Sequence, residues 1–201
     1  MPGLPPLRRS YACLALGLLV LSAFGPALGF EFLHFDDNHY VTENAHVLEG
    51  LSRAGLRWAF ATDNANYWHP LAFVSHMLGV ELYGLDPRGP HLTNLLLHGA
   101  NALLLFLILA GLTKAPWRAF FVAAAFSVHP LQVETVAWVA ERKTLVSVFF
   151  LFLSWAAWAR HARRPSGLLY LASVLGFAGS LAAKPLAVSW PFVLLLLDYW
   201  P

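Results

Sequence analysis

The stretch HLTNLLLHGANALLLFLILAGL, residues 91–112, decides the class of fold, because it is apolar over the length of a membrane helix and contains no Asp, Glu, Lys or Arg. At about 1.5 Å per residue, a helix of this length crosses a hydrocarbon core of about 30 Å. The rest of the chain agrees, since 58% of the 201 residues are hydrophobic and only 12% are charged. Soluble domains carry about 25% charged residues. The sequence therefore predicts an all-α integral membrane protein.

Further apolar runs predict a polytopic helical bundle of about six spans. From the N-terminus they are 11–30, 117–128 with a more polar continuation to 140, 143–159, 168–183 and 186–200. The first run follows Arg8 and Arg9 and has two interpretations, a signal peptide with a small-residue site at 27–29 or an uncleaved span. We favour the span, because the run is long for a signal peptide and other spans follow. Residues 1–30 then hold the N-terminus and first span, and 91–201 a bundle that we expect to be incomplete.

A long polar loop, residues 31–90, separates the first two spans and holds eight of the eleven acidic residues. Two amphipathic helices are predicted within it, over 44–60 and 69–83, with a turn at 63–66 between them. In the first helix one face would carry Leu48, Leu51 and Trp58, and another an i,i+4 ladder of Glu49, Arg53 and Arg57. Helices of this kind lie along a membrane surface.

The basic residues predict one orientation for all spans. They cluster at Arg8 and Arg9, at Lys114 and Arg118, and at Arg160, Arg163 and Arg164. Under the positive-inside rule all three clusters are cytoplasmic. The acidic loop, the segment 129–143 and Lys184 then lie together on the external side.

Two charged pairs on that external side are candidates for chemistry. Asp36 and Asp37, just outside the first span, are placed to deprotonate a hydroxyl or to hold a divalent cation, and the alternative is a solvated acidic turn. Arg142 and Lys143 are cations on the side where the orientation rule does not expect them. They call for a local anion, either a lipid phosphate or the neighbouring carboxylate of Glu141.

Polar residues inside the apolar segments form a second set of candidates. One stripe of the 91–112 span carries His91, Asn94, His98 and Asn101, which would either face a wet cavity or form hydrogen bonds between helices. Pro130 should break the third span and free backbone groups there. His69 and His76 share one helical face, but the nine scattered histidines show no ligand spacing that predicts a metal site.

The single cysteine and the charge balance exclude several classes. Cys13 alone permits no intramolecular disulfide and no multi-cysteine metal site. A net charge of +2 gives no basis for a nucleic-acid partner.

The order of these motifs resembles the membrane part of the transmembrane and TPR-containing O-mannosyltransferase-like proteins, which are GT-C glycosyltransferases. The motifs are Asp36-Asp37, Trp68-His69-Pro70, the H-x-x-N-x-x-x-H pattern from His91 to His98, His129-Pro130 with Glu134, and Glu141-Arg142-Lys143. Lys184-Pro185 and the closing residues 194–201 look like bacterial members. The resemblance covers the chain from about Phe30 onward. Such proteins have more spans and C-terminal TPR repeats, which this stretch does not contain.

The resemblance implies a transfer of a sugar, with mannose as a candidate, from a polyprenyl- or dolichyl-phosphate carrier to a hydroxyl acceptor on protein or elsewhere. It implies Asp36 and Asp37 as the catalytic carboxylates, with Asp37 favoured as the base. Arg142 and Lys143 would contact the donor phosphate. The predicted pocket support comes from His69, His91, Asn94, His98, His129 and Glu134. No cofactor is implied beyond an optional divalent metal.

Location follows from orientation and resemblance together. We expect a bacterial inner membrane with the active site facing the periplasm, or alternatively an endoplasmic reticulum membrane with the site on the luminal face. Two other functions stay open, a non-catalytic scaffold that docks a partner through the first loop and a transporter with a His and Asp proton path. Ionisable residues gather at the external ends of the spans, which favours chemistry on a lipid headgroup over transport.

Overall fold

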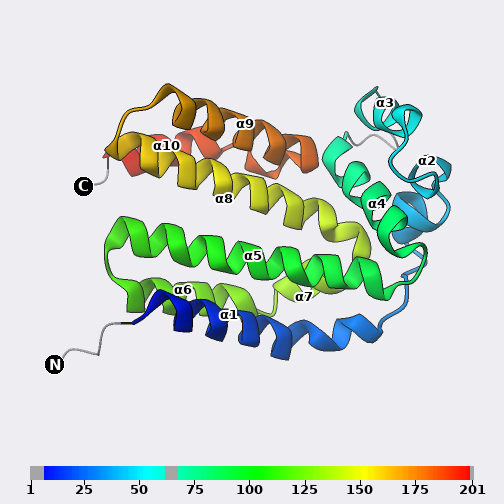
Figure 1. Cartoon of the computed structure of the whole chain (residues 1–201), viewed down its shortest axis with the longest axis horizontal. Coiled ribbons are helices and arrows are strands. Elements are labelled where there is room, and N and C mark those ends of the chain that lie inside the picture. Colours follow the sequence, from blue (N-terminus) through cyan, green and yellow to red (C-terminus); the bar gives the residue numbers. More distant parts are fainter. Residues whose placement is uncertain (1–6, 62–67, 200–201) are drawn as a thin grey trace.

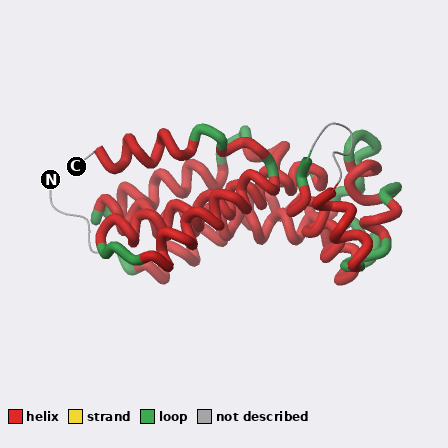
Figure 2. The backbone as a smooth tube through the Cα atoms, turned by 90° about the horizontal axis from the view of Figure 1, so that it is seen from above, coloured by secondary structure: helices red, strands yellow, loops and turns green. Residues whose placement is uncertain are grey.

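The computed structural model describes residues 7–61 and 68–199, and this part of the chain is helical with no strand. Figures 1 and 2 show an elongated bundle with a cap of small helices at one end. The bundle contains α1 (Arg9–Phe24), α5 (Arg88–Thr113), α6 (Pro116–Val128), α8 (Arg142–Arg163), α9 (Gly167–Ala183) and α10 (Trp190–Tyr199). The cap contains η2 (Asn38–Thr42), α2 (Ala45–Leu48), α3 (Arg53–Ala61) and α4 (Pro70–Tyr83). The prediction of an all-α membrane bundle is confirmed.

Three helical segments are long and apolar enough to cross a membrane. They are Arg9–Gly29, which joins α1 to η1 (Gly25–Gly29), then Arg88–Thr113, and Val139–Arg163, which joins η4 (Val139–Glu141) to α8. The other predicted spans correspond to shorter apolar helices of 10–17 residues, α6, α9 and α10. That these three shorter helices also cross the membrane, which would give about six spans, stays a prediction.

Pro130 interrupts the third apolar run as predicted. Helix α6 ends at Val128, His129 is extended with a ψ of 134°, and α7 (Gln132–Ala137) begins two residues after the proline. Proline has no backbone N–H to donate and its ring clashes with the preceding turn, so a helix does not continue through it. The break turns the chain into α7 and η4, which lead to the start of α8.

The first loop helix differs from its prediction. Instead of one helix over 44–60, the chain forms α2 and α3, separated by a turn in which Gly50 has a φ of +70°. Asn44 caps α2 by accepting a hydrogen bond from the Val47 N–H at 3.3 Å, which favours a new helix start there. The predicted ladder from Glu49 therefore does not lie on one helix. The second predicted helix is confirmed as α4, and the predicted turn at 63–66 lies outside the described residues.

Small residues let α8 and α9 approach closely in the bundle. A Cβ added at Gly176 would lie 2.9 Å from the Ser154 backbone nitrogen, a distance that real Cβ atoms essentially never show. The Ser154 hydroxyl donates to the Ser173 carbonyl oxygen at 2.8 Å across the same interface. Small residues and interhelical hydrogen bonds of this kind hold membrane helices together, since apolar side chains gain nothing by leaving lipid.

The basic clusters gather at the end of the bundle opposite the cap (Figure 1). Arg163 donates to the Gly111 carbonyl oxygen, which brings the link after α8 against the end of α5. Leu7 and Ala12 of the N-terminal segment pack with Ala110 and Ala119 beside the link between α5 and α6. The three clusters thus lie on one side of the fold, as the orientation argument requires.

Candidate active site

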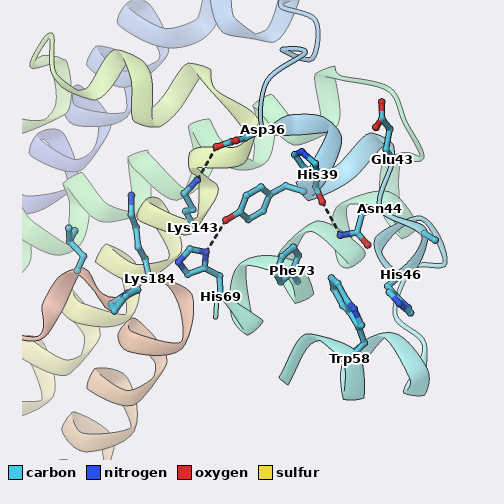
Figure 3. A pocket seen from close by; sticks show the side chains of 14 residues that line it. Asp36, His39, Glu43, Asn44, His46, Trp58, His69, Phe73, Lys143 and Lys184 are labelled. Atoms are coloured by element: carbon cyan, nitrogen blue, oxygen red, sulfur yellow. Dashed lines mark hydrogen bonds and ion pairs between the residues drawn. The ribbon is translucent and has the colours of Figure 1, made fainter. Parts of the chain in front are cut away.

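A cavity of about 830 Å3 lies where the cap meets the ends of α8 and α9 (Figure 3). Its polar side carries Asp36, Lys143 and Lys184, and its aromatic side carries Tyr40, His46, Trp58, His69 and Phe73. Pro185 and Leu186 of η5 (Pro185–Ala187) complete the side nearest the bundle. A volume of this size, with mostly apolar walls and a few charged groups, is typical of a small-molecule site.

The two lysines that line the cavity share one glutamate, Glu141, which is not itself among the lining residues. The Lys143 Nζ lies 3.0 Å from Glu141 Oε1, and the Lys184 Nζ lies 3.1 Å from Glu141 Oε2. Lys184 also donates to the Thr144 hydroxyl oxygen at 2.8 Å. Lys143 sits over the Tyr40 ring, 4.6 Å from its centroid. Two ammonium groups, one from α8 and one from the residue that follows α9, therefore converge on a single carboxylate next to the cavity.

The two adjacent aspartates have different surroundings. The Asp36 side chain is 38% exposed, lines the cavity and lies 3.9 Å from the Lys143 Nζ. Asp37 is 1% exposed and accepts hydrogen bonds from the Leu33 and Ala140 backbone N–H groups, both at 2.8 Å. Burial raises the pKa of the Asp37 carboxyl, and these hydrogen bonds oppose that rise. Asp37 thus fastens the first loop to η4, whereas Asp36 is the carboxylate that lines the cavity.

A tyrosine and a histidine join the cap to the charged side of the cavity. The Tyr40 hydroxyl and His69 Nδ1 are hydrogen-bonded at 2.9 Å, and Tyr40 stacks on Phe73 at 5.2 Å between ring centroids. Burial, followed by the charges of Lys143 and Lys184, lowers the pKa of His69 from 6.5 to about 4. His69 is therefore neutral at pH 7 and adds no positive charge next to the lysines.

We expect stability to fall as the pH drops from 6.5 to about 4, with His69 responsible for part of the loss. A histidine whose pKa is lowered by folding stabilises the fold fully above its unfolded pKa, and this contribution of up to roughly 3 kcal/mol disappears as the pH falls toward the folded pKa. His69→Gln should flatten the pH dependence of the thermal unfolding midpoint in detergent micelles over this range. His129→Gln, at an exposed histidine, is the control. Equal slopes for His69→Gln and the parent protein would contradict the expectation.

Arg142 lies beside the site but inside the protein. It is 0% exposed, and its guanidinium donates to Asn94 Oδ1 at 3.0 Å and to the carbonyl oxygens of Ser75 at 3.1 Å and Pro90 at 3.0 Å. Asn94 in turn donates to the Trp138 carbonyl oxygen at 3.1 Å. The Arg142 guanidinium thus joins α4, α5 and α8, while Lys143 is the member of the predicted pair that lines the cavity.

The remaining predicted pocket residues lie away from the cavity. His91 is 2% exposed and packs edge-on against Phe30 in the bundle. His98 Nε2 is hydrogen-bonded to the Ser127 carbonyl oxygen at 3.0 Å, a contact between α5 and α6. His129 and Glu134 are exposed at and after the Pro130 break. Of the six predicted supporting residues, the structure places only His69 in the cavity lining.

The stripe on α5 holds the bundle together. Asn94 and His98 form the bonds just described, and Asn101 donates to the Leu145 carbonyl oxygen at 3.0 Å. Each of the three is at most 1% exposed. These contacts are the interhelical hydrogen bonds of the second alternative, and neither the cavity of about 830 Å3 nor a second one of about 380 Å3 is lined by a residue of the stripe.

Tyr40 and Lys184 were not among the predicted site residues. The sequence marks Lys184 as a cation on the external side and as part of the Lys184-Pro185 run, but its position 40 residues from Thr144 gives no sign of the contact between them. Tyr40 had no signal beyond its position three residues after the aspartate pair. Within residues 7–61 and 68–199, no group of three or more His, Cys, Asp or Glu side chains is arranged to hold a metal ion.

Comparison with known proteins identifies relatives for the chain. Protein O-mannosyl-transferase Tmtc1 of Drosophila melanogaster is 29% identical over 158 residues, and the human proteins TMTC1 and TMTC4 are 28% and 27% identical over 174 and 182 residues. These matches cover 75%, 78% and 80% of this chain, but only 18%, 19% and 24% of the relatives. No family model and no solved structure matches the chain.

The relatives agree with the membrane fold and with the resemblance seen in the motifs, whereas the likeness to bacterial members stays a prediction. Each of these three matches spans three quarters or more of the chain. The chain, with three helical segments able to cross a membrane, is thus similar to the TMTC protein O-mannosyl-transferases and spans less than a quarter of the length of these three relatives.

Proposed function

We propose that this chain is the N-terminal membrane part of a GT-C-type glycosyltransferase that moves a sugar from a polyprenyl- or dolichyl-phosphate carrier to a hydroxyl group. Mannose is the proposed sugar, because the relatives are named O-mannosyl-transferases, and protein hydroxyls are the proposed acceptors. One observation carries the proposal: Asp36 and Lys143 line the same cavity at the end of a membrane bundle.

In the proposed reaction the acceptor oxygen bonds to the anomeric carbon of the sugar while the bond from that carbon to the phosphate oxygen breaks. The electron pair of the broken bond leaves with the phosphate, and the proton of the acceptor hydroxyl passes to the Asp36 carboxylate. The Lys143 ammonium stabilises the negative charge that grows on the phosphate. Its side chain is only 9% exposed, so water screens this interaction weakly.

Asp37 and Arg142 are assigned positioning roles in this proposal. Asp37 holds the backbone next to Asp36 through its bonds to Leu33 and Ala140. Arg142 keeps the start of α8 in place, and with it the adjacent Lys143. His69 supports the cavity wall through Tyr40.

The proposed site faces the periplasm of a bacterial inner membrane or, in a eukaryotic cell, the lumen of the endoplasmic reticulum. The basic clusters at the opposite end of the bundle support this orientation. In the full-length protein we propose further spans and TPR repeats beyond this stretch. The proposed partners are the lipid-linked donor, the acceptor and membrane lipids.

We expect the full-length protein, reconstituted in liposomes, to transfer labelled mannose from polyprenyl-phosphate mannose to a peptide containing Ser and Thr. The physical reason is that the cavity lies at the end of a membrane bundle, where a lipid carrier places its phosphate. GDP-mannose without the lipid donor should give no product, which serves as the control. Equal transfer from GDP-mannose, or no transfer from the lipid donor by folded protein, would contradict the proposal.

A further inference from the structure

Lys184 belongs to the same charged group as Lys143 but comes from a different part of the fold. It follows α9 directly, and its own carbonyl oxygen accepts a hydrogen bond from the Ser147 hydroxyl of α8 at 3.1 Å. The ammonium reaches the cavity wall with its side chain 28% exposed. Glu141 stands between the two lysines, with its side chain 13% exposed.

We infer that Lys143 and Lys184 form a clamp for one phosphate group, and that Glu141 occupies this clamp until the phosphate enters. The inference rests on the proposed function and adds a second phosphate contact and an internal competitor to it. A carboxylate and a phosphate can both present two oxygens side by side. The two lysines each contact one oxygen of the Glu141 carboxylate, so the same arrangement can hold two oxygens of a phosphate. Without Glu141, the two cations would repel each other, and Asp36, 3.9 Å from the Lys143 Nζ, would offset this repulsion only in part.

Each lysine has a second contact besides Glu141, although the Thr144 hydroxyl that contacts Lys184 also donates to Glu141 Oε2. Lys184 donates to the Thr144 hydroxyl oxygen, and Lys143 lies over the Tyr40 ring. A structural ion pair would lose its geometry when the carboxylate turns away. Here the Tyr40 ring still lies beside Lys143 and the Thr144 hydroxyl beside Lys184 when the carboxylate turns away, so each ammonium keeps a neighbour while one anion is exchanged for another.

The wall next to Lys184 favours a phosphate that is carried by a lipid. Pro185 and Leu186 follow Lys184 and line the same cavity, and Leu186 is 57% exposed. An apolar surface directly beside a cation suits a ligand with an anionic head and an isoprenoid chain. Free inorganic phosphate is the other source of the same anion, and the test separates the two.

The test measures the affinity of the whole chain, purified in detergent micelles, for farnesyl phosphate, farnesol and inorganic phosphate. Lys184→Met and Lys143→Met remove one ammonium each and retain an unbranched side chain. Lys114→Met is the matched control, because Lys114 is the remaining lysine of the sequence and follows α5 in the link to α6, away from the cavity lining. Thermal unfolding of each variant verifies that it is folded.

We expect Lys184→Met and Lys143→Met each to weaken farnesyl phosphate binding about tenfold or more, the effect of a lost charge-assisted hydrogen bond, while Lys114→Met binds as the parent does. Glu141→Gln should bind farnesyl phosphate about threefold or more tightly, because the competing anion is gone. Unchanged affinity in Lys184→Met would overturn the clamp. Affinity in Glu141→Gln that stays equal or falls would overturn the internal competitor.

The three ligands distinguish a phosphate carried by a lipid from free inorganic phosphate. Binding of farnesyl phosphate but of neither farnesol nor inorganic phosphate supports a lipid-carried anion. Inorganic phosphate that binds as tightly, with the same dependence on Lys184, supports the clamp and overturns the lipid source. No sugar moves in these measurements, so failure of the clamp and failure of the proposed transfer reaction are distinguishable.

Discussion

Asp36→Asn should lower the rate of sugar transfer by the full-length protein about 10²- to 10⁴-fold, the usual cost of removing a general base. This corresponds to roughly 3–5 kcal/mol of activation free energy. The amide has nearly the size of the carboxylate but cannot take the acceptor proton. Because the Asp36 carboxylate accepts no hydrogen bond from a backbone N–H among the described contacts and is 38% exposed, the change should leave the thermal unfolding midpoint intact.

Two companion variants sharpen this expectation. Asp86→Asn is the matched control, because Asp86 is exposed, lies outside the cavity lining and accepts one hydrogen bond from the Arg88 N–H at 3.0 Å. It should transfer sugar at the parent rate. Asp37→Asn should lower the unfolding midpoint, because an amide NH2 group then faces a backbone N–H that donated to the carboxylate.

The outcome decides between the two aspartates. A folded Asp36→Asn variant with the parent rate would remove Asp36 as the base. If Asp37→Asn alone lost activity at an unchanged unfolding midpoint, Asp37 would be the base, as the sequence predicts. If neither variant changed the rate, the non-catalytic scaffold would become the better account of the first loop.

The helices could be predicted from the sequence because their causes are local. A run of apolar residues at membrane length predicted α5, and a proline without a donor N–H predicted the end of α6 next to His129. The division of 44–60 was missed, although its signals were local as well. Asn44 as a cap and Gly50 at a positive φ mark a short helix and a turn, whereas the apolar spacing alone predicts a single helix over both.

The site was only partly predictable because its contacts are distant in the sequence. The position of the aspartate pair indicated the right loop, but adjacent residues point in different directions once the chain folds. Asp37 is buried because it reaches the Ala140 N–H, 103 residues away, and that contact leaves Asp36 to face the cavity. A similar distant contact, from Lys184 to Thr144, supplies the cation that the motif Glu141-Arg142-Lys143 did not reveal.

Arg142→Ala should destabilise the protein by about 3–5 kcal/mol, because it leaves Asn94 Oδ1 and the carbonyl oxygens of Ser75 and Pro90 buried without their donor. Arg142→Lys should recover only part of the loss, because an ammonium cannot reach three acceptors with the fixed fork of a guanidinium. The measurement is the unfolding midpoint in detergent micelles, with Arg118→Ala at the basic end of the bundle as the control.

Farnesyl phosphate affinity separates this structural role from the phosphate contact predicted from the sequence. Arg142 is 0% exposed, and each nitrogen of its guanidinium donates to a protein oxygen, so a phosphate would have to displace buried partners to reach it. We therefore expect Arg142→Lys, where it is still folded, to bind farnesyl phosphate within about threefold of the parent. A folded variant with an unchanged unfolding midpoint and a tenfold weaker affinity would contradict this expectation. It would show that Arg142 contacts the phosphate and that it does not anchor α4, α5 and α8.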